Sequence, residues 1–443
     1  MEQTRIIPPG GDNGPDVRTR ALDAATDKTA MAGVLRALDI ECFPGNRYAL
    51  STEPSREHVL IQLKSAPGVM GRRLPLNIAL VIDRSGSMEG EPLDYVKRAC
   101  GYVVDLLEPT DILSIVTFAE QVDVIMPARR VINKALLKEH INRIEVGNTT
   151  NLYDGIVVGA NQVMSAYSEG YLNRVLLFTD GEPTAGIKDF ASIVGQVAEQ
   201  KSRGITVTAL GFGPEYNEEL MAGIARQSGG NYYYISRPEL IPEIFRRELE
   251  SLMTITARNI RLRLGLSRWV QLRQIYGKQP SYGERYAEVN LVDMERGSAI
   301  SVLCELEFAP RPAGIYRVMK AEVFYNDAVS NQNEVLSADI EFEFTPEKTL
   351  IPTGVNPIVK QELEVALASR NLEKTVMGMK TQQLSAMAAT AELERTMNIL
   401  LDQGRVQEAE EVKKAIDSVK RGGPDAEKTL VGTIYNLDRG KKK

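Results

Sequence analysis

The stretch LNIALVIDRSGS, residues 76–87, decides how the rest of this chain is interpreted. Its first seven residues are apolar except for Asn77, and such a run before a turn signal is typical of a buried parallel strand. Asp83, Ser85 and Ser87 follow directly, so a carboxylate and two hydroxyls lie just past the carboxyl end of that strand. Ligands bind at this edge of open α/β sheets, and oxygen donors suit a hard cation such as Mg²⁺. Taken alone, the same residues could instead cap the helix that begins near Pro92.

The sequence from residue 76 to about residue 253 alternates strand-like and helical runs. Helical runs with a period of 3.6 residues include Leu93–Leu107 and Leu152–Tyr167. This alternation predicts a mostly parallel sheet with helices on both faces. The strand-like runs after the first are Ile112–Phe118, Val122–Met126, Arg174–Thr179, Ile205–Gly211 and Asn231–Ile235.

Two later motifs add oxygen donors to the same edge of the predicted sheet. GNTTNLY, residues 147–153, is typical of a turn that opens a helix, and Thr150 is at a position where its hydroxyl is expected to project from the loop. LLFTDGEP, residues 176–183, is an apolar strand that ends in Asp180. If this strand neighbours the first one where the strand order reverses, the carboxyl ends meet there. Asp83, Ser85, Ser87, Thr150 and Asp180 are then predicted to converge on one cation.

The motifs DRSGS, GNTTNLYDG and LLFTDGEP, in this order and spacing, resemble the metal-ion-dependent adhesion site of the von Willebrand factor A domain. The later runs TALGFG (208–213) and GGNYYYI (229–235) are similar to the fifth and sixth strands of that domain. The resemblance covers roughly residues 75–253. It implies a doubly wound, Rossmann-like sheet of strand order 3-2-1-4-5-6 with one antiparallel strand.

The resemblance also implies an intact adhesion site that binds Mg²⁺, with Mn²⁺ and Ca²⁺ as alternatives. In that family pattern Ser85 and Ser87 would bind the metal directly, and Thr150 would do so once a ligand is engaged. Asp83 and Asp180 would act largely through water. The whole chain is similar to bacterial von Willebrand A proteins that are often labelled calcium-activated-chloride-channel-like, although no predicted membrane segment supports a channel.

The flanking sequence predicts further domains. Residues 254–344 alternate polar and apolar residues, most clearly in ELEF (305–308) and EFEF (341–344), which is typical of an antiparallel β-sandwich. Short strands at 47–63 have the same character, so we expect one sandwich with the α/β domain inserted in it. Apolar stripes predict three C-terminal helices. The expected parts are a flexible tail (1–40), sandwich strands (41–70), the von Willebrand A domain (75–253), the sandwich (254–350), a helical bundle or hairpin (356–422) and a flexible tail (423–443).

Composition excludes several functional classes. The chain has 443 residues and a net charge of −6, which gives no support to a nucleic-acid role. No stretch reaches the roughly 20 apolar residues that span a bilayer, and the N-terminus does not resemble a secretory signal. The three cysteines are far apart, which argues against a disulfide framework or zinc site and favours the cytoplasm. The basic run Arg439–Lys443 is interpreted as a solvated terminus.

No catalytic arrangement is evident, and we expect the protein not to be an enzyme. The two histidines, His58 and His140, lie in a strand-like run and on a helix, where structural or surface roles are expected. The nucleophile elbow GxSxG, the zinc motif HExxH and the Walker loop are absent from the sequence.

The expected function is a cytosolic, metal-dependent protein-binding module that serves as an adaptor or assembly factor. Mg²⁺ takes about six ligands, so a site of this kind leaves a position for the Asp or Glu carboxylate of a partner protein. The alternative is a structural scaffold with a non-essential metal site. In that alternative a kinase phosphorylates tail threonines and forkhead-associated domains read them. The candidate threonines are Thr4, Thr29, Thr429 and Thr433.

Overall fold

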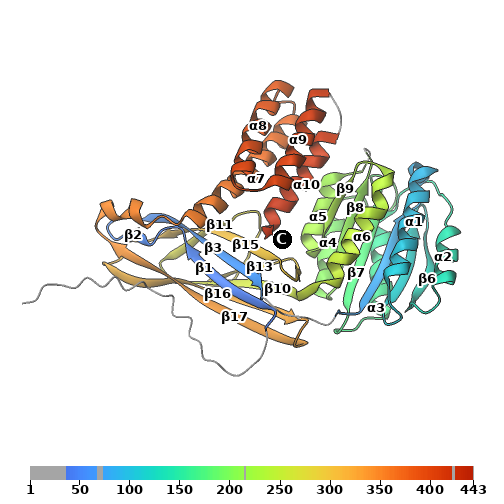
Figure 1. Cartoon of the computed structure of the whole chain (residues 1–443), viewed down its shortest axis with the longest axis horizontal. Coiled ribbons are helices and arrows are strands. Elements are labelled where there is room, and N and C mark those ends of the chain that lie inside the picture. Colours follow the sequence, from blue (N-terminus) through green and yellow to red (C-terminus); the bar gives the residue numbers. More distant parts are fainter. Residues whose placement is uncertain (1–35, 67–72, 214–215, 422–424, 443) are drawn as a thin grey trace, which may run out of the picture. The chain divides into compact units, whose positions relative to one another are not determined.

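The computed structural model describes residues 36–66, 73–213, 216–421 and 425–442. Its α/β domain has a six-stranded sheet of order β6-β5-β4-β7-β8-β9 (Figure 1). β6 is antiparallel to β5, and the other neighbouring pairs are parallel, which is the predicted order 3-2-1-4-5-6. The strands are β4 (Leu76–Asp83), β5 (Ile112–Phe118), β6 (Val122–Arg130), β7 (Leu172–Thr179), β8 (Thr206–Phe212) and β9 (Tyr232–Ile235).

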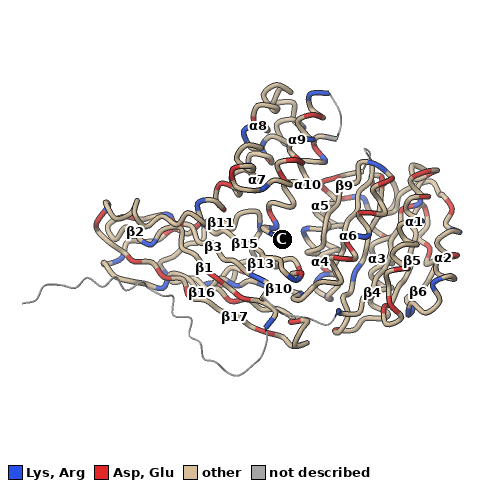
Figure 2. The backbone as a smooth tube through the Cα atoms, in the orientation of Figure 1, with Lys and Arg blue, Asp and Glu red and all other residues tan. Residues whose placement is uncertain are grey.

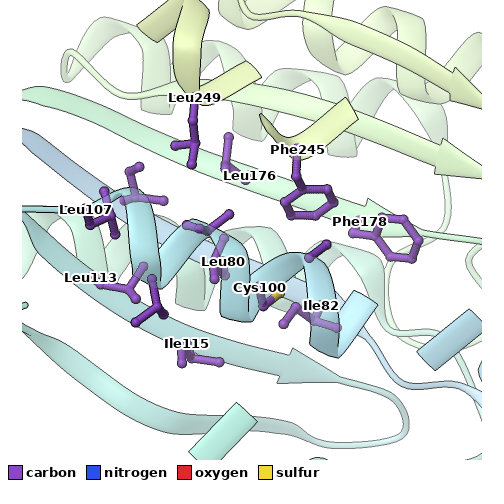
Figure 3. Packing of buried hydrophobic residues seen from close by; sticks show 14 of the residues in the cluster. Leu80, Ile82, Cys100, Leu107, Leu113, Ile115, Leu176, Phe178, Phe245 and Leu249 are labelled. Atoms are coloured by element: carbon purple, nitrogen blue, oxygen red, sulfur yellow. The ribbon is translucent and has the colours of Figure 1, made fainter. Parts of the chain in front are cut away.

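Helices cover both faces of this sheet. Successive side chains of each strand point to opposite faces, and those of β4, which are mostly apolar, are buried on both faces, so each face needs a cover. Leu80 and Ile82 of β4 belong to the core beneath α1, α2 and α6, where Figure 3 shows them near Cys100 and Phe245. Val81 belongs to the core beneath α3, α4 and α5. The helices are α1 (Glu91–Leu106), α2 (Lys134–Asn142), α3 (Leu152–Ser165), α4 (Phe190–Ser202), α5 (Glu218–Ser228) and α6 (Ile241–Met253), with short 3₁₀ turns η1 (Gly86–Met88) and η2 (Pro238–Leu240).

Strands from both flanks of the α/β domain build a β-sandwich. One sheet has the order β1-β3-β15-β11, with β18 also pairing with β15, and the other has the order β12-β13-β10-β16-β17-β2, with β14 also pairing with β10. Side chains from the two sheets meet in a single apolar core. The strands are β1 (Leu38–Pro44), β2 (Tyr48–Leu50), β3 (Ser55–Ser65), β10 (Ile255–Leu266), β11 (Val270–Ile275), β12 (Ser281–Tyr282), β13 (Tyr286–Asn290), β14 (Met294–Glu295), β15 (Ala299–Phe308), β16 (Gly314–Asp327), β17 (Gln332–Thr345) and β18 (Lys441–Lys442).

The predicted flexible tail over residues 1–40 is wrong at its C-terminal end, and residues 1–35 lie outside the described part of the chain. β1 begins at Leu38 and pairs antiparallel with β3. Ala37 is fully buried, and its backbone N–H donates to Asp327 Oδ2 at 2.7 Å. Alternating apolar residues in β1 therefore complete the edge of the sandwich.

Residues 356–422 form the three predicted helices, and a fourth helix follows them where the sequence predicted a flexible tail. After the 3₁₀ turn η3 (Lys348–Gly354), the helices are α7 (Pro357–Lys380), α8 (Ala386–Asp402), α9 (Val406–Arg421) and α10 (Asp425–Arg439). Within the described ranges, no helix is both long enough and apolar enough to cross a membrane.

The predicted flexible tail over residues 423–443 is also wrong where the structure describes it. Leu430, Ile434 and Leu437 of α10 join the core of the helical segment. Thr433 is fully buried, and its hydroxyl bonds with Glu411 Oε2 at 3.0 Å, so it is not the accessible threonine that the sequence predicted. Thr429 lies on the same helix, whereas Thr4 and Thr29 lie outside the described residues.

The basic C-terminal run is not a solvated terminus either. Lys441 is 11% exposed and forms an ion pair with Glu295, and its backbone belongs to β18, which pairs with β15. Nearby, Arg174 of β7 forms a buried ion pair with Asp293 of the sandwich segment. These pairs supply partners for charges that would otherwise be buried alone, which is the condition under which proteins tolerate them.

Candidate metal centre

Asp83 anchors the candidate site at the carboxyl end of the central strand β4. Its side chain is fully buried, and burial raises its pKa, against hydrogen bonds that lower it. One carboxylate oxygen accepts from the backbone N–H of Ser85 at 2.8 Å, and the other accepts from the hydroxyl of Thr179. Both donors fix the orientation of the carboxylate, so Asp83 is held in place before any ligand arrives.

Ser85, Ser87 and Asp180 are joined by hydrogen bonds. Ser85 Oγ lies 3.2 Å from Ser87 Oγ, and Ser87 Oγ donates to Asp180 Oδ1 at 2.8 Å. Asp180 follows β7 directly, and β7 pairs in parallel with β4, so the two strand ends lie side by side. Ser85 and Asp180 are buried whereas Ser87 between them is exposed, so the row of oxygens reaches the surface at Ser87.

Thr150 reaches the same place from the loop before α3. A Cβ built on Gly181 would lie 3.7 Å from Thr150 Oγ1 and 3.9 Å from Ser87 Oγ, so both hydroxyls flank this glycine. The backbone N–H of Thr150 donates to Thr184 Oγ1 at 2.8 Å, and the N–H of Thr184 returns a bond to Thr150 O at 3.0 Å. The loops that follow β7 and precede α3 are therefore clamped together.

The loop at residues 147–150 is also tied to the loop after β4. Gly147 N donates to Arg84 O at 2.5 Å, and Gly86 N donates to Asn148 O at 3.2 Å. Arg84 forms an ion pair with Asp123 at 2.9 Å, which directs its charge away from Asp83. The structure thus brings the five predicted site residues to one edge of the sheet, on three interlocked loops.

The donor set fits a hard divalent cation. Within the described ranges, the hydrogen-bond donors to Asp83 are the hydroxyl of Thr179 and the backbone amide and hydroxyl of Ser85, none of which carries a charge. A buried carboxylate is costly without a cation or strong hydrogen bonds. Two carboxylates and three hydroxyls supply only oxygen atoms, which are the ligands that Mg²⁺ and Ca²⁺ prefer. No group of three or more His, Cys, Asp or Glu side chains in the described residues is placed to hold a metal ion.

Sequence reasoning missed two residues that support this site. Thr179 orients the Asp83 carboxylate, and Thr184 holds the Thr150 loop. A signal for Thr179 was present, because it immediately precedes Asp180 at the end of the strand predicted to neighbour β4. Thr184 had no such signal, since its partner is 34 residues away in the sequence.

The histidines and cysteines of the described residues lie away from this edge. His58 of β3 is half-buried in the sandwich, where its Nε2 lies 3.3 Å from Tyr276 Oη and burial lowers its pKa. His140 lies on α2. Cys42, Cys100 and Cys304 are free thiols, and burial raises the pKa of each to about 12. A thiol with so high a pKa is a poor nucleophile at neutral pH.

Comparison with known proteins first defines the class of domain. Residues 77–247 match the family model described as von Willebrand factor type A domain. The chain therefore carries a von Willebrand factor type A domain, and the predicted fold class, an α/β Rossmann-like domain with a C-terminal helical segment, is confirmed.

Two bacterial proteins are similar to this chain over more than half of its length. An uncharacterized protein of Synechocystis is 29% identical over 276 residues, which are 60% of this chain and 65% of that protein. The uncharacterized protein YfbK of Escherichia coli is 29% identical over 285 residues, which are 62% of this chain and 50% of that protein. The chain thus spans less than two-thirds of the length of either curated relative.

One solved structure extends the likeness beyond the α/β domain. A von Willebrand factor type A protein from Catenulispora acidiphila matches with a TM-score of 0.71 and 16% identity, over 86% of this chain and 90% of that one. At this level of identity the likeness is one of fold. It shows that the combination of α/β domain, sandwich and helices is a shared architecture.

Proposed function

We propose that this chain is a metal-dependent protein-binding module, an adaptor or assembly factor that captures an acidic residue of a partner protein. Asp83, Ser85, Ser87, Thr150 and Asp180 would hold the metal, with Mg²⁺ as the preferred ion and Mn²⁺ or Ca²⁺ as alternatives. The observation that carries this proposal is the row of hydrogen-bonded oxygens from Ser85 through Ser87 to Asp180 beside the buried Asp83.

The chemistry follows from the number and kind of donors. A bound Mg²⁺ takes about six oxygen ligands and would supply the positive charge that attracts a partner's carboxylate. Ser87 is exposed, so the row of oxygens opens to solvent on the side where a partner could approach. Asp83 is fixed by Thr179 and Ser85, so its orientation changes little when a ligand binds. Domains of this class commonly mediate metal-dependent interactions between proteins, which supports the proposal.

The proposal assigns the chain no catalytic activity and places it in the cytoplasm. The free cysteines support a reducing compartment, where disulfides seldom persist. The described histidines and cysteines are spread over sandwich and helices rather than gathered at the candidate site.

Partner capture with matched variants tests the proposal. The full chain is immobilised in Mg²⁺ and exposed to cell lysate, and bound proteins are eluted with a chelator. Asp83→Ala and Ser85→Ala should lower capture at least about tenfold, a loss of roughly 1.4 kcal/mol. Glu89→Gln removes the charge of an exposed residue in the same loop that is not among the five site residues, and this variant should capture partner protein as the wild type does. Capture that is the same in chelator and in both site variants would refute the proposal.

The same experiment separates the scaffold alternative. If the metal site is non-essential, deletion of the helical segment removes binding while Asp83→Ala leaves it intact. The buried position of Thr433 weakens the part of that alternative that relies on phosphorylated C-terminal threonines.

A further inference from the structure

A groove separate from the metal centre lies between the edge strand β6 and helix α2. It has a volume of about 470 Å³, which is within the range of protein sites that bind ligands. Both the strand and the helix contribute to it, as does the turn that joins them. Its lining residues are Pro127, Ala128, Arg129, Arg130, Ile132, Asn133, Leu136 and Leu137.

Two arginines give the groove a positive charge. Arg129 and Arg130 are exposed, and within the described residues neither forms an ion pair (Figure 2 colours the Lys and Arg positions of β6 and α2). The nearby basic residue Lys138 of α2 is paired with Asp105 at 2.7 Å. The nearby acidic residue Glu139 is already paired with Arg143. The arginines are therefore the charges left for an incoming group, and that group must be an anion.

Apolar side chains complete the recognition surface. Ile132 is 78% exposed and Leu136 is 38% exposed, and both line the groove beside Pro127. Large apolar side chains that gather in a hollow rimmed by charge mark interaction sites. The groove therefore places an apolar surface next to arginines that can bind a carboxylate.

The edge of β6 does not favour a partner that adds as a further strand. Pro127 has no backbone N–H, and the N–H of Ala128 donates to Gln162 Oε1 of α3 at 3.2 Å. Proline and irregular pairing protect sheet edges from strand addition, and the β5–β6 register shifts twice. Recognition at this groove must therefore depend on side chains.

The groove lies apart from the metal centre along β6. Asp123, near the start of the strand, pairs with Arg84 of the metal-site loop. Arg129 comes six residues later, and strand residues rise about 3.3 Å each, so the separation is roughly 20 Å. A carboxylate held in the groove cannot at the same time reach the metal.

We propose that the groove between β6 and α2 is a second, metal-independent protein-binding surface. It takes an extended segment of a partner protein that carries a carboxylate close to a large apolar side chain. The carboxylate pairs with Arg129, which is opposite Leu113 of the core beneath α2, while Arg130 adds positive charge at the edge of the groove. The apolar side chain covers Ile132 and Leu136. This surface does not depend on the metal-dependent function proposed above.

Short synthetic peptides of defined chemistry test this proposal. Each consists of glycine and serine with one aspartate, one leucine, or both at varied spacing. They are titrated into the full chain in chelator, so that the metal centre cannot hold a carboxylate. Binding is followed by the methyl resonances of Ile132 and Leu136. The best peptide that carries both aspartate and leucine should bind about tenfold tighter than a peptide that carries only one of them, because burying one leucine is worth about that factor.

Matched variants locate the binding. A double variant with Arg129→Ser and Arg130→Ser should remove the increase in affinity that aspartate gives the peptide. Ile132→Ser should remove the increase that leucine gives. Arg268→Ser and Val335→Ser change exposed residues of the sandwich segment and should leave both gains unchanged. Thermal unfolding of each variant confirms that it is folded.

Three results would overturn the proposal. The first is equal binding of all peptides, or gains that persist in the groove variants. The second is binding that needs Mg²⁺ and is lost in Asp83→Ala, which would place the carboxylate at the metal centre. The third is a short DNA duplex that displaces the peptides, or self-association lost in Ile132→Ser, which would assign the groove to nucleic acid or to a second copy of the chain.

Discussion

Individual residues at the candidate metal centre are held by contacts that leave little freedom. Asp83 is oriented by two donors, and Thr150 is fixed through its backbone rather than its hydroxyl. The hydroxyl of Thr150 therefore stays available for a ligand while its loop stays in place. Metal affinity should depend on residues that never touch the metal but hold these loops.

Gly186 provides a test of that dependence. Its φ is +67°, and a Cβ there would lie 2.2 Å from Oδ1 of Asn151, which caps α3 next to Thr150. Gly186→Ala should displace the Thr150 loop and weaken Mg²⁺ binding by roughly tenfold, as strain of 1–3 kcal/mol allows. Gly297→Ala is the control, since Gly297 has φ +74° with no atom near its Cβ position. If both variants bind Mg²⁺ with wild-type affinity, the loop clamp does not set the site.

Glu57 of β3 predicts a pH dependence of stability in the sandwich. Burial raises its pKa to about 7, so the folded protein holds its proton more tightly than the unfolded chain does. At low pH Glu57 is protonated in both states and does not change the free energy of unfolding. As pH rises from about 4.5 to about 7, the unfolded chain loses this proton first, so the folded protein becomes less stable. Glu57→Gln should remove this loss and stabilise the protein by about 1–2 kcal/mol near pH 8, less than the full shift because the side chain is partly exposed.

Thermal unfolding midpoints at about pH 5 and about pH 8 check this expectation. The midpoint difference between wild type and Glu57→Gln should be small at the lower pH and clear at the higher one. If the midpoint difference between wild type and Glu57→Gln is the same at both pH values, the raised pKa of Glu57 is contradicted.

At the scale of elements, the sequence predicted what local patterns encode and missed what distant contacts decide. The buried run of β4 and the motif ends at Asp180 and Thr150 were sufficient to predict the α/β sheet and the edge at which these residues meet. α10 has apolar residues at Leu430, Ile434 and Leu437, so its period was visible, but the Gly-Gly-Pro run before it suggested a chain end. The pairing of β18 with β15 had no local signal, because the two strands are far apart in the sequence.

Lys428 of α10 contacts the α/β domain through three interactions. Its ammonium donates to Tyr216 O at 2.6 Å, pairs with Glu218 at 3.0 Å and lies 4.2 Å from the centre of the Tyr216 ring. Lys428→Met keeps the length of the side chain but leaves the Tyr216 carbonyl without this donor. We expect a loss of about 1–3 kcal/mol in the docking of α10.

Hydrogen exchange measured by mass spectrometry checks that loss. Amides of α10 should exchange faster in Lys428→Met, while those of β16 and β17 in the sandwich should not change. Lys420→Met is the control, since Lys420 is 55% exposed and pairs with Glu394 on the surface of the helical segment. Equal protection of α10 in both variants and in the wild type would show that Lys428 does not secure the helix.

At the scale of the whole molecule, buried charges join segments that are far apart in the sequence. Arg174 of β7 pairs with Asp293 and so links the α/β domain to the sandwich segment, and Lys441 of β18 pairs with Glu295 of β14 within the sandwich. Burial lowers the pKa of Lys441 to about 8, so its charge depends on that partner. The sequence showed these residues only as scattered charges, because their pairing requires the sandwich, the helices and the α/β domain to be assembled. The five residues of the candidate metal centre, by contrast, all lie within the α/β domain.

Five oxygen-bearing side chains, those of Asp83, Ser85, Ser87, Thr150 and Asp180, are proposed to form one cation site. Calorimetric titration of Mg²⁺ into chelator-treated, metal-free protein tests this claim most directly, with Asp83→Ala as the disabled variant and Asp94→Ala of α1 as the control. The wild type and Asp94→Ala should each bind one equivalent of Mg²⁺, and Asp83→Ala should bind none. Equal binding by the wild type and Asp83→Ala, or no binding by the wild type, would contradict the claim.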